Sequence, residues 1–217
     1  MPVIALLALA LALAAILDRP STRSPAGARA SGSTASPGAV AGEAPAASTA
    51  SSTSGFDGAA LPASTPPHDF TLADQAGRPV SLSRYRGEVT ILAFLYSTCG
   101  PTCIVIADQI RGALDELPRP VPVLFVSADP AADTPARVSR FLAQVSLTGR
   151  VRYLSGSQAA LRPIWRAYGV VPATSGRTAF DRSAAVLLLD RSGRERVIFG
   201  LEQLTPEGLA HDVRKLQ

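Results

Sequence analysis

The 217-residue chain has two cysteines, Cys99 and Cys103, and they lie only four positions apart. A secreted protein that depends on disulfides for stability usually spaces its cysteines widely. In the loop-entropy model, closing a loop of about 5 residues gains only about 2 kcal/mol, against about 4.7 kcal/mol for a loop of about 100 residues. The folded part must therefore be held by a hydrophobic core, and the cysteine pair is better suited to reactivity than to stabilisation.

The charge distribution excludes one broad class of function. The chain has 21 Lys and Arg residues against 17 Asp and Glu, which gives a formal net charge of +4. All but one of the basic residues are Arg, and they are spread along the chain rather than clustered. Because there is no block of basic residues, we expect no nucleic-acid binding.

The first residues form an apolar leader. Val3 to Leu17 is an unbroken run of Val, Ile, Leu and Ala, which would span about 22 Å as a helix, less than the roughly 30 Å of a hydrocarbon core. We expect residues 1–19 to be a signal peptide or a membrane anchor. Ala28-Arg29-Ala30 offers a cleavage site, but the usual basic region before the apolar run is absent. Both alternatives predict a protein on the extracytoplasmic side of the cell membrane, anchored or secreted.

The next segment differs sharply in composition. Residues 20–55 are mostly Ala, Ser, Thr, Gly and Pro, with almost no large side chain. Such a segment cannot bury enough apolar surface to offset its conformational entropy. We therefore expect a disordered linker that holds the following domain away from a membrane surface.

The remaining residues, 56–217, are expected to form one α/β domain. The order of apolar runs and turn signals predicts a thioredoxin-like sandwich, with a central mixed sheet and flanking helices. Thr134 and Pro135 mark a helix start, and Pro163 should break or kink the helix in which it lies. The expected strands are 70–72, 79–82, 89–96, 121–126, 151–154, 186–190 and 195–199, and the expected helices are 104–117, 135–144, 158–168 and 205–216.

The cysteine pair falls where the apolar strand at 89–96 leads into a helix. Backbone N–H groups and the helix dipole at such a position favour a thiolate and lower the pKa of the first cysteine. Residues four apart on a helix have Cβ atoms about 5–6 Å apart, so a disulfide needs a local adjustment of the backbone. The pair could thus form a disulfide or hold one soft cation, while a purely structural role remains the alternative.

Several motifs together resemble the Sco/SenC family of cytochrome oxidase assembly proteins, over about residues 56–216. The Cys-x-x-x-Cys motif alone is weak evidence, but the downstream Asp-Pro and Asp-Thr-Pro motifs strengthen it. The matching segments are Asp69-Phe70-Thr71-Leu72 with Gly77 and Ser81-Leu82, Cys99 to Cys103, Val126 to Pro130 with Asp133-Thr134-Pro135, Tyr168-Gly169-Val170, and Leu188-Leu189-Asp190 with Gly193.

The resemblance implies a membrane-tethered thioredoxin fold whose Cys99 and Cys103 bind copper or control the redox state of cysteines that receive copper. The implied partner is a respiratory oxidase subunit or another cysteine-bearing copper protein. In the family a histidine completes the copper site, and its position here is occupied by Arg182. A guanidinium has no lone pair to donate. If Arg182 points inward, it opposes copper and favours the Cys99 thiolate, which shifts the balance toward thiol–disulfide exchange.

Other polar and aromatic residues receive simpler interpretations. His68, His211 and Met1 are expected to be bystanders rather than copper ligands. Asp129 and Asp133 are expected to end a strand and cap a helix rather than to bind metal or act in acid–base chemistry. Tyr96 could line the cysteine site, although packing is the commoner role. The aromatic residues expected in the core are Phe141, Trp165, Phe180 and Phe199.

We therefore expect a thiol–disulfide oxidoreductase of copper-centre assembly that also binds copper weakly. Three alternatives stay open. The chain could be a copper-binding metallochaperone without catalysis. A peroxiredoxin would have Thr three residues before its reactive cysteine, where Tyr96 stands here. A thioredoxin-type oxidoreductase would have Cys-x-x-Cys, and a proline where Ala184 stands.

Overall fold

The computed structural model describes residues 54–217, so the predicted leader and almost all of the predicted linker lie outside the described residues. Those assignments, and the domain boundary at residue 56, stay predictions. Among the helices of residues 54–217, none has the length and apolar character needed to cross a membrane.

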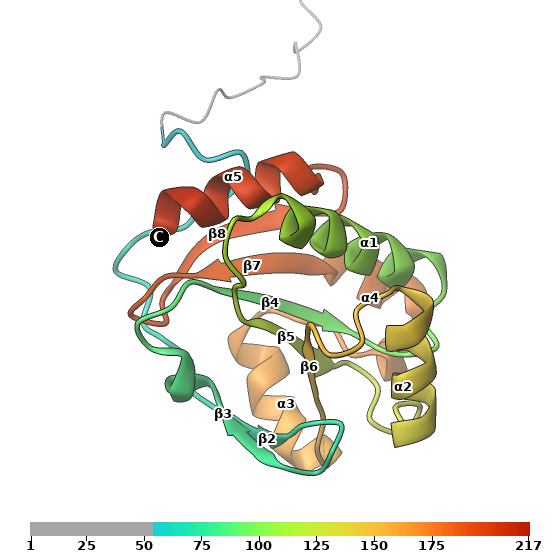
Figure 1. Ribbon diagram of the computed structural model, residues 1–217. Coiled ribbons are helices and arrows are strands. Elements are labelled where there is room, and N and C mark those ends of the chain that lie inside the picture. Colours follow the sequence, from blue (N-terminus) through green and yellow to red (C-terminus); the bar gives the residue numbers. More distant parts are fainter. Residues whose placement is uncertain (1–53) are drawn as a thin grey trace, which may run out of the picture. The chain divides into compact units, whose positions relative to one another are not determined.

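The centre of the domain is a six-stranded mixed sheet (Figure 1). Its order is β1 (Ala59–Ala60), β8 (Glu195–Gly200), β7 (Ala185–Leu189), β4 (Thr90–Leu95), β5 (Val123–Ser127) and β6 (Arg152–Leu154). The strands β4, β5 and β6 are parallel, whereas β7 runs antiparallel to both β4 and β8. All six residues of β4 are buried, as the unbroken apolar run predicted. A separate hairpin pairs β2 (Thr71–Ala73) with β3 (Pro79–Ser81).

Helices cover both faces of the sheet and enclose two apolar clusters. On one face, α1 (Pro101–Glu116) and α5 (Pro206–Leu216) lie side by side (Figure 1). On the other face, α3 (Gln158–Ala167) and the β2–β3 hairpin pack against the sheet. The helix α2 (Pro135–Gln144) follows β5. This arrangement confirms the predicted thioredoxin-like fold, and the aromatic residues predicted to lie in the core are all buried.

The helix start predicted at Thr134 and Pro135 is confirmed. The hydroxyl of Thr134 accepts the backbone N–H of Arg137 at 3.4 Å, and Pro135 is the first helical residue, as expected. Pro163 was expected to break or kink its helix; it does not break it, because α3 continues through it, and the kink stays a prediction. Both Pro163 and Ala159, whose carbonyl loses its helical donor, are exposed, so water can satisfy that carbonyl.

Three further features were not predicted. They are the two-residue edge strand β1, the short 3-10 turns at Leu82–Tyr85 and Ala173–Ser175, and the seven-residue helix α4 (Arg177–Ser183). The last of these bears on function, because α4 occupies the segment in which the family histidine was expected. Its Phe180 is fully buried.

Candidate dithiol site

Cys99 and Cys103 are joined by a disulfide at the start of α1, with their Cα atoms 5.8 Å apart. Cys99 lies just before the helix, whereas Cys103 is in its first turn. Between them, Gly100 has φ of 80° and Pro101 begins the helix. The left-handed backbone at Gly100, which glycine adopts at little cost, is the local adjustment that brings the two cysteines together. The predicted position and bridging of the pair are confirmed.

The disulfide is almost inaccessible to solvent. Cys99 is 1% exposed and Cys103 is fully buried within the cluster beneath α1. A thiolate that attacks a disulfide must approach one sulfur directly. A partner protein can therefore react with this pair only after neighbouring residues move aside.

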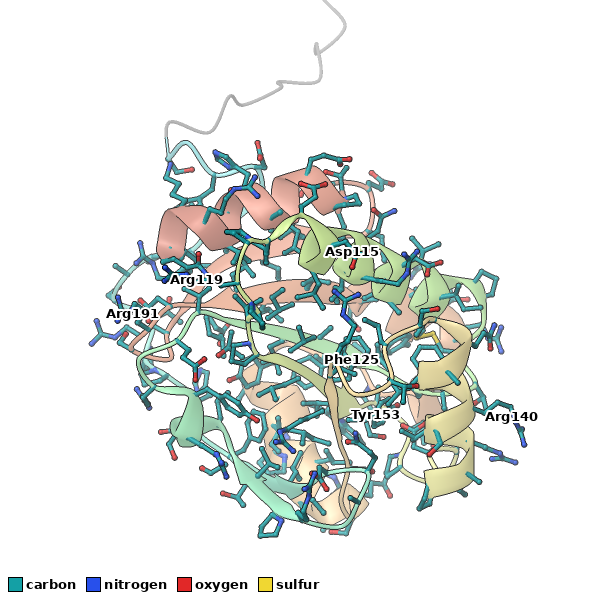
Figure 2. The ribbon with its side chains drawn as sticks, viewed as in Figure 1. Asp115, Arg119, Phe125, Arg140, Tyr153 and Arg191 are labelled. Atoms are coloured by element: carbon teal, nitrogen blue, oxygen red, sulfur yellow. A yellow bond between two sulfur atoms is a disulfide. The ribbon has the colours of Figure 1, made fainter. Side chains whose placement is uncertain are left out.

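A buried carboxylate holds the loop that leads into the disulfide. Asp133 accepts the backbone N–H of Ser97, the hydroxyl of Ser127 and the hydroxyl of Tyr153, each at 2.6 Å. Tyr153 lies beside Phe125 in the domain interior (Figure 2). Burial, with the nearby Asp133 charge as a second cause, raises the pKa of Tyr153 well above its usual value, so the phenol remains a donor. Asp133 thus holds the loop before Cys99 in place.

The expected roles of the two aspartates were therefore only partly right. Asp129 closes the turn after β5, since its side chain accepts the Ala132 N–H at 3.2 Å. Thr134, rather than Asp133, caps α2. The sequence signal was the Asp-Thr-Pro motif, which marks the helix start but does not reveal where the Asp133 carboxylate points.

The cation next to the cysteine loop is Arg177. A Cβ added at Gly100 would lie 3.4 Å from Nη1 of Arg177, so the guanidinium covers the turn between the two cysteines. Arg177 also acts on Tyr96, which packs edge-to-face on Phe180 with ring centroids 5.0 Å apart. Burial raises the pKa of Tyr96, the Arg177 charge opposes that rise, and the Asp181 charge adds to it. Arg177 and Asp181 thus lie on one side of α4, facing the dithiol region.

Arg182 has a different location. Its side chain is exposed and lines a surface groove with Phe94, Tyr168 and Gln203, and neither cysteine lines that groove. Five helical positions rotate a side chain by about 140°, so Arg177 and Arg182 point to nearly opposite sides of α4. The condition that Arg182 points inward is not met, so its charge is not expected to act on Cys99, and Arg177 is the arginine of α4 that lies near Gly100.

The remaining candidate donors are not brought to the disulfide. His68 packs edge-to-face on Tyr168, with ring centroids 5.7 Å apart, and its carbonyl accepts the Tyr168 hydroxyl at 3.0 Å. His211 is on α5, where its Nδ1 lies 2.9 Å from Asp212 and 3.1 Å from Asp57. His211 therefore contacts two carboxylates away from the cysteines, and its expected role as a bystander to the copper site stays a prediction. Met1 lies outside the described residues.

The fold and site define a thioredoxin-fold protein with a dithiol pair at the start of its first long helix. The family model of SCO1/SenC matches residues 59–217, and the chain belongs to this family.

Individual relatives agree with that assignment. A copper-bound structure of ScoI from Bradyrhizobium japonicum is 28% identical, with a TM-score of 0.53, and the match covers 70% of this chain and 99% of that one. The mitochondrial protein SCO2 homolog of Bos taurus is 27% identical over 135 residues, which is 58% of this chain and 50% of the bovine protein. The chain therefore spans half the length of that relative.

A peroxiredoxin is also among the similar proteins. The chloroplastic peroxiredoxin Q of Sedum lineare is 27% identical over 158 residues, covering 70% of this chain and 75% of the plant protein. Similarity at this level is compatible with a shared fold and different chemistry, so the residues at the site must separate the two functions.

Proposed function

We propose that this chain acts in the assembly of the copper centre of a respiratory oxidase, through thiol–disulfide exchange at Cys99 and Cys103. The observation that carries the proposal is the disulfide at the start of α1 in a domain of this family. Its partner would be an oxidase subunit or another cysteine-bearing copper protein. The apolar leader further supports a location on the extracytoplasmic side of the membrane.

The exchange moves two electrons between this pair and two cysteines of the partner. In the reducing direction, the Cys99 thiolate attacks a partner disulfide and forms a mixed disulfide, and one partner thiolate leaves. Cys103 then attacks Cys99, which closes the disulfide seen here and releases the second partner thiolate. The opposite direction starts from the oxidised pair and ends with a disulfide on the partner.

Two arginines of α4 favour thiol exchange over tight copper binding. Arg177 stands over the Gly100 turn, and a cation there favours the Cys99 thiolate in the reduced protein. Arg182 replaces the family histidine and cannot donate to a metal, so the reduced pair offers Cu(I) two thiolates and no imidazole from that position. Copper is then a weakly held cargo, and thiol exchange is the dominant activity.

The test is a copper titration of the reduced full-length chain against its Arg177→His variant, because Arg177 is the arginine of α4 that lies near the cysteine turn. An imidazole at this position should raise the affinity for Cu(I) by about tenfold or more, since even the partners that support a metal ligand are typically worth about 10–100-fold. Arg182→His is the matched control and should leave the affinity unchanged, because residue 182 lines a groove that neither cysteine lines. If the parent binds one Cu(I) as tightly as the Arg177→His variant, another residue completes the site, and the metallochaperone function takes first place.

The peroxiredoxin alternative is tested separately. Tyr96 occupies the position where that enzyme class has Thr, and it is buried against Phe180 rather than free to contact a peroxide. We expect neither the reduced chain nor its Cys103→Ser variant, in which Cys99 is the only remaining thiol, to consume hydrogen peroxide faster than free cysteine does. Rapid peroxide turnover that survives in this variant would favour the peroxiredoxin.

A further inference from the structure

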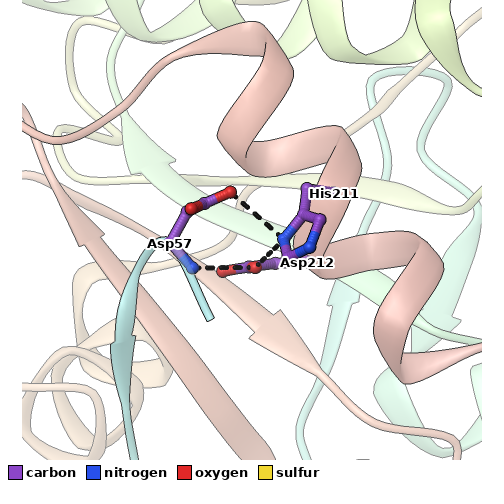
Figure 3. A group of neighbouring side chains, drawn as sticks. All are labelled: Asp57, His211 and Asp212. Atoms are coloured by element: carbon purple, nitrogen blue, oxygen red, sulfur yellow. Dashed lines mark hydrogen bonds and ion pairs between the residues drawn. The ribbon is translucent and has the colours of Figure 1, made fainter. Parts of the chain in front are cut away.

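Three polar side chains lie close together where the segment before β1 contacts α5, the last helix. His211 and Asp212 come from α5, and Asp57 comes from the segment just before β1 (Figure 3). One donor atom of each residue lies within 4.8 Å of the others. We name this group the amino-terminal clasp. It is distinct from the dithiol site, because β1 is an edge strand separated from β4 by two other strands.

The distances from His211 to the two carboxylates are those of neighbouring ligands around one metal ion. Nδ1 of His211 is 3.1 Å from Oδ2 of Asp57 and 2.9 Å from Oδ1 of Asp212. Bonds of about 2.1 Å to nitrogen and oxygen, at angles of roughly 90–109°, place neighbouring ligand atoms about 3.0–3.4 Å apart. A divalent ion could therefore bind Nδ1 and the two carboxylates with little movement of the side chains.

The carboxylate of Asp212, the buried residue of the clasp, is held in a fixed orientation by hydrogen bonds. The Asp212 side chain has no exposed surface, and it accepts the backbone N–H groups of Asp57 and Gly58, both at 2.9 Å. Oδ2 accepts the Gly58 N–H, and Oδ1 accepts that of Asp57 while it also faces His211, so one lone pair of Oδ1 remains for a metal and both bonds can persist. Hydrogen bonds of this kind to a ligating carboxylate fix its direction and raise metal affinity.

Glycines make room for the exposed member. Gly208 lies in α5, one turn before Asp212, and a Cβ there would meet the Cβ of Asp57 at 3.2 Å. A Cβ at Gly58 would collide with Val197 at 2.5 Å. A glycine inside a helix costs about 1 kcal/mol relative to alanine. Here it allows Asp57 to approach the helix closely enough to face His211.

The clasp also remains open to a fourth ligand. His211 is 49% and Asp57 56% exposed, so water or an external group can reach the centre. Lys215, one turn further along α5, donates to the Ser54 carbonyl at 2.8 Å and lies over the Phe56 ring, rather than pairing with these carboxylates. Two carboxylates and one neutral imidazole would balance the charge of a divalent ion.

We infer that Asp57, His211 and Asp212 form a second metal site, for a first-row divalent ion such as Zn²⁺. Imidazole nitrogen with carboxylate oxygen suits such ions, whereas Cu(I) prefers the sulfur ligands of the dithiol site. This inference does not rest on the proposed function.

The test is a calorimetric titration of the oxidised full-length chain with Zn²⁺, because the closed disulfide removes both thiolates as competing ligands. We expect one ion to bind per chain, and His211→Gln or Asp57→Asn to weaken binding by about tenfold or more. His68→Gln is the matched control, since it removes the other imidazole, and it should bind like the parent.

A second measurement guards against variants that only disturb folding. Zn²⁺ in excess should raise the melting temperature of the parent and of His68→Gln, but not that of His211→Gln, because a ligand stabilises only the state that binds it. If the oxidised parent takes up no Zn²⁺, or if His211→Gln binds as tightly as the parent, the clasp is a hydrogen-bonded contact only and the inference is overturned.

Discussion

The dithiol site and the amino-terminal clasp are both organised by a buried aspartate, but they use it in opposite ways. Asp133 is enclosed by the Ser97 backbone and two hydroxyls, and the sulfurs that it helps to position are shielded from water. Asp212 is anchored by two backbone N–H groups and presents an oxygen toward half-exposed partners. A buried aspartate thus supports a disulfide that is shielded from solvent in one region and a polar cluster that is open to solvent in the other.

The largest expected effect is that of a substitution that destroys the dithiol site and leaves the clasp unchanged. Cys103→Ser should abolish both the disulfide and the two-thiolate copper site, while Zn²⁺ binding at the clasp remains as in the parent. Loss of Cu(I) can be measured by competition with a chromogenic chelator, and Zn²⁺ by calorimetry. A variant that also lost Zn²⁺ binding would show that the two regions are coupled.

The next effect compares the two anchors. Asp133→Asn should lower the free energy of unfolding by about 2–4 kcal/mol, because an amide cannot satisfy three donors as a carboxylate does. Asp212→Asn should cost about 1–3 kcal/mol, since it weakens two bonds from backbone N–H groups. Urea denaturation of the oxidised proteins measures both. The reverse ranking would mean that the clasp is the more important anchor.

A smaller effect distinguishes the two arginines of α4. In the reduced protein, Arg177→Gln should slow the alkylation of Cys99 by iodoacetamide at neutral pH by about threefold to tenfold, because the thiolate loses a nearby cation. The matched variant Arg182→Gln should leave the rate unchanged. Equal effects from both substitutions would contradict the assignment of Arg177 as the cation over the cysteine turn.

The smallest effect concerns Asp74, a third buried carboxylate, in the β2–β3 hairpin. Burial alone would raise the pKa of Asp74, but hydrogen bonds from Arg78 and Ala76 outweigh burial and lower it. A group with a lowered pKa in the folded state stabilises the protein above its unfolded pKa of 3.8, and that stability is lost as pH falls further. Unfolding free energies measured between pH 6 and pH 3 should therefore converge for the parent and Asp74→Asn at the acid end.

Much of the fold and part of the dithiol site could be predicted from local sequence. The apolar run at β4, the helix start at Thr134 and Pro135 and the short cysteine spacing each act over a few residues, and each agrees with the structure, whereas α1 begins at Pro101, three residues before its predicted start. The helix α4 was missed because its seven residues have no side-chain cap and too few turns to show a clear periodicity.

Features that depend on rotation or on distant pairing could not be predicted. Counting positions placed Arg182 where the family histidine stands, but the rotation of α4 decides that Arg177 faces the cysteines. The clasp joins Asp57 to a residue 155 positions away, through the pairing of β1 with β8. No local pattern near His211 indicates that a second carboxylate lies beside it.

The clasp also determines how the domain bears mechanical load. Lys215 donates to the Ser54 carbonyl, Asp212 accepts the backbone N–H groups of Asp57 and Gly58, and β1 then joins the edge of the sheet. Tension that arrives along the chain from before Ser54 therefore acts first on α5 and on an edge strand. The strand β4, which leads to the cysteines, lies three places further into the sheet. A pull on the domain therefore meets the edge of the sheet before it reaches the strand that leads to the cysteines.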